Sequence, residues 1–301
     1  MKKLIIAGGT GFLGQALCRH FEHSFDEIVI LSRTENKTEG KVRYVTWDAK
    51  TFGSWCRELE GTEAVINLCG KSVDCRYTEK NKAIIFSSRL ESTKIIGEAI
   101  ERCNVPPALW INGASATIYR HSETEPMTEK EGEIGSGFSV EVCKAWEKVF
   151  NSFTLAATRK VNMRISMVMG KTGGVFPALT GVVKKGLGGT MGKGTQQVSW
   201  VHVDDFCRMV EWFINNKGAS GIYNSVAPLP ITNRHMMQLL RKKLHIPIGL
   251  PAASWMLEIG AMLIGTETEL ILKSRYSYPE RGLKEGFTFK YQNFEECLSS
   301  L

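Results

Sequence analysis

The chain has 301 residues, 43% of them hydrophobic, enough to bury the core of one large α/β domain or of one domain with a smaller appendage. The formal net charge of +7 is modest and spread along the chain, and no apolar run approaches the ~18 residues that span a bilayer. The eight cysteines lack metal-like spacing, so we expect free thiols in a cytoplasmic protein with no metal, nucleic-acid or membrane partner.

The first predicted element is a buried strand over residues 4–7, followed directly by a glycine-rich turn and an amphipathic stretch. A strand, a glycine turn and a helix N-terminus together cradle a pyrophosphate. Gly8 would permit the tight turn, Gly11 would let the backbone approach phosphate oxygens, and Gly14 would let the helix pack on the sheet. Thr10 adds a hydroxyl that could reach phosphate. The spacing G-x-x-G-x-x-G therefore predicts dinucleotide binding, and the alternative is a glycine-rich turn without a ligand.

The second predicted strand, residues 27–31, ends at Ser32 and Arg33. A dinucleotide fold that prefers NAD usually places an acid here, about 20 residues past the glycines, to bind the ribose 2′-hydroxyl. A guanidinium instead pairs with a 2′-phosphate through several donors. The sequence thus predicts NADP over NAD, and the alternative is that Arg33 is a solvated loop charge.

Strand and helix patterns alternate through the first two thirds of the chain, which predicts an α/β fold with a doubly wound, Rossmann-type parallel sheet. The further expected strands cover residues 43–48, 64–70, 108–112, 161–168 and 221–225. The expected helices after the first cover residues 79–102, 139–156 and 203–214. From about residue 170 the pattern loosens, which indicates loops and small helices over the mouth of the sheet.

We expect a dinucleotide-binding Rossmann domain over residues 1–217, with interleaved substrate-side segments from about residue 170. Residues 218–301 would form a small, partly helical C-terminal substrate-side region. Within that region, residues 250–263 and 286–291 are expected to roof the substrate side without touching the adenine half of the cofactor.

Ligands of open parallel sheets bind beyond the carboxyl ends of the strands, so these ends should line one cleft. The candidate cofactor-binding residues at this edge are Gly8, Thr10, Gly11, Phe12, Leu13, Ser32, Arg33, Leu68, Cys69, Gly70 and Val168. Ser115 follows the fifth predicted strand at the same edge. Each has an alternative interpretation as ordinary loop structure, and Cys69 is expected to be a small apolar filler rather than a nucleophile.

These motifs together resemble the extended short-chain dehydrogenase/reductase superfamily. The glycine turn carries the resemblance, as do residues 67–70, which look like its N-x-A-G segment, and Ser115, which falls where its catalytic serine sits. Further motifs resemble an atypical sugar-nucleotide-epimerase-like branch with a short C-terminal domain: Tyr77–Lys80, Ser88–Thr93, Lys144–Glu147, Gly188–Gly194, Ser199–Asp205 and Gly286–Phe289. The resemblance covers almost the whole chain and implies a Rossmann-type core, NADP(H) as cofactor, and a substrate that is unassigned for the branch.

One departure from the superfamily pattern concerns the proton donor. Its members use Tyr-x-x-x-Lys on the helix after the fifth strand, where the lysine lowers the pKa of the phenol that transfers a proton. Lys144 lies where that lysine is expected, but Val140 stands in the place of the tyrosine, and valine has no proton to give. Tyr119, just past Ser115, is the nearest replacement, and the alternative is an aromatic that packs the pocket wall.

The resemblance implies an NADP-dependent oxidoreductase or redox epimerase acting on a small carbonyl or sugar-like substrate. Ser115 would hold the substrate oxygen, and Lys144 would orient the ribose or supply positive charge. The missing tyrosine favours a rival interpretation, a non-catalytic NADP(H)-binding sensor or structural protein. The oligomeric state is left open, with a homodimer among the options.

Two further residues carry separate expectations. Arg89, in the Ser88–Thr93 motif on the long helix, is expected to contact a cofactor phosphate or ribose, and the alternative is a solvated helix charge. His202 precedes a predicted helix start and is expected to be structural, with a pocket residue as the alternative.

Overall fold

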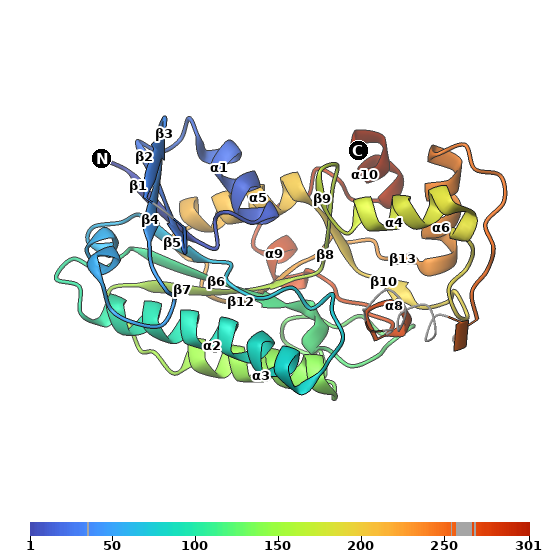
Figure 1. The fold of residues 1–301 in the computed structure, drawn as a ribbon, viewed down its shortest axis with the longest axis horizontal. Helices are drawn as coiled ribbons and strands as arrows, with labels where there is room; N and C mark the ends of the chain where they lie inside the picture. Colours follow the sequence, from blue (N-terminus) through green and yellow to red (C-terminus); the bar gives the residue numbers. More distant parts are fainter. Residues whose placement is uncertain (35, 254, 257–266, 268) are drawn as a thin grey trace.

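The computed structural model describes residues 1–34, 36–253, 255–256, 267 and 269–301, and its main feature is an eight-stranded sheet (Figure 1). Its strands are β1 (Lys3–Ala7), β2 (Glu27–Ser32), β3 (Lys37–Glu39), β4 (Val42–Thr46), β5 (Ala64–Asn67), β6 (Leu109–Ser115), β7 (Arg159–Ile165) and β12 (Gly221–Ser225). The order is β12-β7-β6-β5-β1-β2-β4-β3, and only the β3–β4 pair is antiparallel. The chain runs from β1 outward in both directions, which confirms the predicted doubly wound, Rossmann-type fold.

Successive residues of β1 face opposite layers because side chains alternate along a strand. Leu4 and Ile6 join the core with helices α1 (Phe12–Phe21) and α5 (Val203–Asn215), whereas Ile5 faces helices α2 (Glu79–Glu101) and α3 (Phe138–Asn151). Figure 1 shows α2 and α3 side by side on one face of the sheet and α1 and α5 on the other. Burial on both faces explains why the central strands read as continuous apolar runs in the sequence.

A second region lies beside the sheet, at the end remote from β3 (Figure 1). It contains the strands β8 (Met167–Gly170), β9 (Gly173–Gly174), β10 (Gln197–Val198), β11 (Trp200–His202) and β13 (Ile231–Thr232). Its helices include α4 (Phe176–Val182), α6 (Asn233–Lys243) and α10 (Phe294–Ser300), which share a core around Trp200 and Met237. Two further short helices, α8 (Glu269–Leu272) and α9 (Glu280–Lys284), lie between α6 and α10 in the sequence.

The predicted strand over residues 161–168 is wrong as a single element. It divides at Ser166, whose backbone N–H and hydroxyl both donate to the carbonyl of Ser225, and β8 then leaves the main sheet to pair with β11. The helix predicted to run to residue 156 ends at Asn151. Among the described residues, no helix is both long enough and apolar enough to cross a membrane.

The expected roof over the substrate side is wrong for residues 286–291. Phe287 and Phe289 are buried in the core on the α5 face, and the backbone N–H groups of Lys290 and Tyr291 donate to the carboxylate of Asp205. This segment therefore packs against α5. Most of the other expected roof segment, residues 254 and 257–263, lies outside the described residues.

Candidate functional site

The glycine turn between β1 and α1 has the geometry that its sequence predicts. Gly8 has a φ of +78°, and a Cβ added there would lie 3.0 Å from the carbonyl carbon of Leu68. A Cβ on Gly14 would lie 2.4 Å from the Cα of Gly9, so α1 approaches the turn too closely for any other residue. A Cβ on Gly11, by contrast, would meet only the oxygen of Gly8, at 3.5 Å. Contacts within the described protein therefore do not require glycine at position 11, in contrast to positions 8 and 14.

The parallel register brings the predicted strand ends to one edge of the sheet. Ala7 is paired with Asn67, and Asn67 with Asn112, so the segments that follow β1, β5 and β6 are neighbours. A buried amide pair supports this edge, because Asn67 Nδ2 donates to Asn112 Oδ1 at 3.1 Å. Asn67 Oδ1 also accepts from the N–H of Cys69 at 3.1 Å, which fixes the segment over residues 68–70.

Ser32 and Arg33 lie at the end of β2 but face different surroundings. The Ser32 hydroxyl is buried and bonds the Thr34 hydroxyl at 2.7 Å, so it shapes the loop. Arg33 is exposed, and in the part of the chain that the structure describes no ion pair involves it. Burial raises the pKa of the Cys69 thiol to about 12, and the charge of Arg33 opposes that rise. The Arg33 charge therefore acts on the strand-end segment that contains Cys69.

Three predicted cofactor-binding residues pack in the core on the α1 and α5 face of the sheet. The ring of Phe12 packs against β8 and β9, since a Cβ on Gly170 or Gly173 would lie 2.4 or 2.3 Å from it. Leu13 packs against the same core cluster, and Val168 on β8 is buried in that cluster. The side chain of Val168 thus serves the core.

Arg89 of α2 is half-buried and engaged with the protein, so the alternative of a solvated helix charge is wrong. Its Nη1 donates to the Ile85 carbonyl at 3.0 Å, and its guanidinium lies 5.3 Å from the ring centre of Trp146. A Cβ on Gly70 would come within 3.0 Å of its Cζ, which puts the charge directly behind this strand end. Burial lowers the pKa of Arg89. Contact with the cofactor stays a prediction.

Ser115 lies at the end of β6, as predicted. Its Oγ accepts from the N–H of Thr117 at 3.2 Å and caps a short 3₁₀ turn over Ala116–Ile118. The side chain is half-buried, and its role in holding a substrate oxygen stays a prediction.

Tyr119 belongs to a buried polar network that the sequence did not reveal. Its hydroxyl donates to Asn224 Oδ1 and accepts from Arg164 Nη1, both at 2.8 Å, and the residue is 0% exposed. Arg164 in turn makes a double hydrogen bond to Glu147, with distances of 2.7 and 2.8 Å. Burial raises the pKa of Tyr119, and Val140 packs in the same apolar cluster. These contacts favour the packing interpretation of Tyr119 over proton donation.

Lys144 and His202 are the last two residues with a role predicted from the sequence. Lys144 is exposed on α3, and its Nζ lies 3.0 Å from Oε1 of Glu141, within the same helix. His202 is buried at the start of α5, where its Nδ1 accepts from the N–H of Asp204 at 3.0 Å. Its Nε2 lies 3.1 Å from the Ser300 hydroxyl. The cap and this second contact support the structural interpretation of His202.

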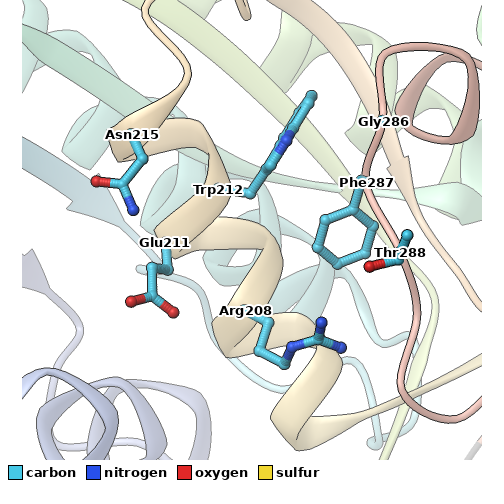
Figure 2. Close-up of a pocket in the computed structure, with 7 residues that line it drawn as sticks. All are labelled: Arg208, Glu211, Trp212, Asn215, Gly286, Phe287 and Thr288. Carbon is cyan, nitrogen blue, oxygen red and sulfur yellow. The ribbon is translucent and has the colours of Figure 1, made fainter.

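A separate cavity of about 220 Å³ lies on α5, away from these strand ends. Figure 2 shows its lining residues: Arg208, Glu211, Trp212, Asn215, Gly286, Phe287 and Thr288. The rings of Trp212 and Phe287 are 5.9 Å apart, and Arg208 is paired with Asp205 at 2.7 Å. None of the predicted site residues lines this cavity.

A parallel sheet whose carboxyl edge carries a glycine turn, with a second region beside it, defines a nucleotide-binding class of α/β protein. The chain belongs to the NAD dependent epimerase/dehydratase family, whose model matches residues 4–225. A domain of unknown function (DUF1731) matches residues 252–301. Both matches confirm the resemblance to epimerase-like proteins with a short C-terminal domain.

Curated relatives are similar over their whole length. The epimerase family protein YfhF of Bacillus subtilis (strain 168) is 31% identical over 299 residues, which cover 99% of this chain and 97% of that protein. The epimerase family protein SA0724 of Staphylococcus aureus (strain N315) is 29% identical over 303 residues, covering 100% and 99%.

Two solved structures are similar at 25% sequence identity. The human epimerase family protein SDR39U1 (isoform 2), solved with NADPH, has a TM-score of 0.88 and covers 99% of this chain and 98% of its own. The nucleoside-diphosphate sugar epimerase of Corynebacterium glutamicum has a TM-score of 0.79, covering 99% of this chain and 57% of that one.

Proposed function

We propose that this protein binds NADP(H) along the carboxyl edge of the sheet and acts as an oxidoreductase or redox epimerase on a small carbonyl or sugar-like substrate. The observation that carries the proposal is the tight glycine turn between β1 and α1, together with an exposed arginine at the end of β2 that no described carboxylate neutralises. A carboxylate at the end of β2 would repel a 2′-phosphate, and Arg33 attracts one. The NADPH in the structure of the human relative supports the same cofactor here.

The residues at this edge fit the parts of a dinucleotide. The first turn of α1, at Phe12 and Leu13, offers backbone N–H groups and the positive end of a helix dipole for the pyrophosphate, whereas the N–H of Gly11 donates to the Gly8 carbonyl. Thr10 adds a hydroxyl, and Ser32 with Arg33 would hold the phosphorylated ribose. The segment over residues 68–70 would border the nicotinamide half. When bound, the cofactor supplies or accepts the hydride.

Within the proposal, Ser115 holds the substrate oxygen and Lys144 supplies positive charge near the ribose. No ionisable group stands at Val140, so the proton comes from a bound water, from Lys144 or from Tyr119. Loss of a well-placed acid typically costs ~10²–10⁴ in rate, so turnover should be slow compared with ordinary short-chain reductases.

Titration of the protein with NADPH and with NADH, followed by cofactor fluorescence, tests the cofactor assignment. We expect NADPH to bind more tightly. Equal affinities for the two cofactors would contradict the role given to Arg33.

A second candidate function is a non-catalytic NADP(H)-binding sensor or structural protein. Two observations favour it: an apolar residue at position 140, and the burial of the Tyr119 hydroxyl in a hydrogen-bonded network. A panel of aldehydes, ketones and keto sugars, followed by NADPH oxidation, separates the two candidates. Tight NADPH binding with no oxidation by any member would favour the sensor.

A further inference from the structure

Arg275 carries unsatisfied hydrogen-bond donors inside the protein. It follows α8, its side chain is 14% exposed, and neither its Nε nor its Nη2 has a hydrogen-bond partner among the residues that the structure describes. The remaining nitrogen, Nη1, makes only a 3.5 Å contact to the carbonyl of Lys273. An unmatched buried donor destabilises the folded state, more so when it is charged, so a side chain of this kind favours the binding of an acceptor.

Arg89 is a second cation that lacks a carboxylate, and it is half-buried. Among the described residues it makes no ion pair, and its guanidinium donates to the carbonyl of Ile85. Gly70 is exposed at the cleft edge, and the guanidinium lies directly behind it. A ligand at this strand end would therefore approach Arg89 first.

Contacts of α3 relate the two arginines: the Arg89 guanidinium lies 5.3 Å from the ring centre of Trp146, and Ser139 donates to Glu269, which lies 4.0 Å from Arg275. Burial lowers the pKa of both Arg89 and Arg275, and the ionised forms of Tyr77 and Cys143 would oppose that shift at each of them. These two side chains thus lie within electrostatic range of both guanidinium groups. The Tyr77 hydroxyl bonds the Ser139 hydroxyl at 3.2 Å, so α3 also contributes to this cluster.

Negative charge in the cluster falls short of positive charge. Glu269 accepts from Ser139 at 3.0 Å, and its other oxygen lies 3.5 Å from Lys273 Nζ and 4.0 Å from Arg275 Nη2. The neighbouring Glu267 pairs with Arg76 at 3.3 Å. In the described part of the chain, one carboxylate therefore serves Lys273 and Arg275, and none serves Arg89. Buried charges are usually compensated by partners, so this excess favours an anionic ligand.

We propose that Arg89 and Arg275 bind an anionic, oxygen-bearing group of the substrate, a carboxylate or a phosphate, beside Tyr77 and Ser139. The planar guanidinium fork matches the geometry of both groups and can donate two parallel hydrogen bonds. This inference rests on the proposed function, because it gives the substrate of the NADP(H)-dependent reaction an acidic group.

The test uses the full chain saturated with NADPH, so that the cofactor already fills its own site. Malonate, inorganic phosphate and the neutral malonamide are each titrated at an ionic strength held constant with sodium chloride, and thermal unfolding is followed. We expect malonate or phosphate, but not malonamide, to raise the Tm in a saturable way. The stronger of the two anions identifies the group as a carboxylate or a phosphate.

Variants assign the effect to the cluster. We expect Arg275→Met and Arg89→Met to weaken anion binding by about 10- to 100-fold, the worth of one lost charge-assisted contact. The matched control Arg234→Met removes an exposed arginine of the second region and should leave binding unchanged. Arg275→Lys keeps the charge but loses the fork, so it should bind with intermediate affinity and covers the case in which the methionine variant does not fold.

The outcomes separate this inference from the proposed function. Equal anion binding by Arg275→Lys, Arg275→Met and Arg234→Met, or an equal response to malonamide, would overturn the anion site. Anion binding that depends on the cluster in a protein that fails to bind NADPH would overturn the proposed function and leave the site standing. A loss of NADPH affinity in Arg89→Met, with anion binding unchanged, would instead assign Arg89 to the cofactor.

Discussion

The arginines at the two ends of the sheet's carboxyl edge differ in exposure and in the partners available to them. At the end of β2, Arg33 is exposed and makes no ion pair among the described residues. At the other end, Arg89 is half-buried and Arg275 is largely buried, and the described carboxylates are too few to pair with both. An exposed cation costs little in the absence of a ligand, whereas a buried one weakens the fold until an anion compensates it.

Arg164 is an arginine whose charge and guanidinium nitrogen atoms are all matched by partners within the protein. Arg164 is buried, and Glu147 and the Tyr119 hydroxyl satisfy three of its nitrogen atoms. Burial alone therefore does not mark a ligand site. The unmet hydrogen bonds of Arg275 distinguish it from Arg164.

The largest expected effect is on the compensated pair. Glu147→Gln leaves the Arg164 guanidinium buried without its carboxylate, which should cost about 3–5 kcal/mol in the free energy of unfolding. Chemical denaturation of the variant measures the loss. Glu141→Gln on the same helix removes an exposed partner of Lys144 and should cost about 0–1 kcal/mol. Similar losses in the two variants would show that the Arg164 network is not the structural core of this end.

The next effect concerns the exposed arginine. Arg33→Ala should weaken NADPH binding by roughly 1–3 kcal/mol, the worth of a lost charge-assisted contact, and leave NADH binding and stability almost unchanged. Cofactor titration and thermal unfolding measure the two quantities. Arg57→Ala, another exposed arginine of the N-terminal half, serves as the control. An equal loss for NADPH and NADH would place Arg33 outside the 2′-phosphate site.

The same contrast explains what the sequence could predict. The order of β1, the glycine turn and α1 depends on residues that are neighbours in the sequence. The spacing of the glycines therefore predicts the tight turn at Gly8 and the close helix packing at Gly14, and the structure confirms both. The break at Ser166 was missed because its partner, Ser225, is distant in the chain and no glycine or proline marks the bend. Local sequence patterns predict the glycine turn, whereas the break at Ser166 depends on a tertiary contact.

Some features of the candidate site are likewise predicted by the sequence, and others depend on tertiary contacts. The sequence suggests Tyr119 as proton donor only because it follows Ser115 closely, yet Asn224, 105 residues away, fixes its hydroxyl. Arg89 on α2, Ser139 on α3 and Arg275 after α8 are far apart in the sequence, so no residue spacing predicts that they belong to one site. Arg89 was predicted from a motif, but its burial against Trp146 became visible only in the structure.

A smaller effect should follow from removing the Tyr119 hydroxyl. Tyr119→Phe leaves Arg164 and Asn224 each short of one hydrogen bond, which should cost about 1–2 kcal/mol of stability. On any carbonyl substrate that proves active, its rate and pH profile should stay close to those of the unmodified chain. Lys144→Met, tested beside it, should change the rate if that lysine supplies charge to the reaction. A pH profile that changes only in Tyr119→Phe would restore the tyrosine as proton donor.

The smallest effect is a pH dependence of stability from His202. Burial lowers the pKa of His202 below its usual 6.5, against the pull of Asp204 and Asp205. The unfolded chain therefore binds the proton more readily, so this contribution is complete above pH 6.5 and is lost as the pH falls through the folded-state pKa. Protonation at Nδ1 would also remove the acceptor for the N–H of Asp204 at the start of α5. His202→Asn keeps a capping acceptor but cannot titrate, so its unfolding free energy should vary less between about pH 5 and 7. His23→Asn, at an exposed histidine, should reproduce the unmodified curve, and a His202→Asn curve as steep as the parent's would assign the acid sensitivity elsewhere.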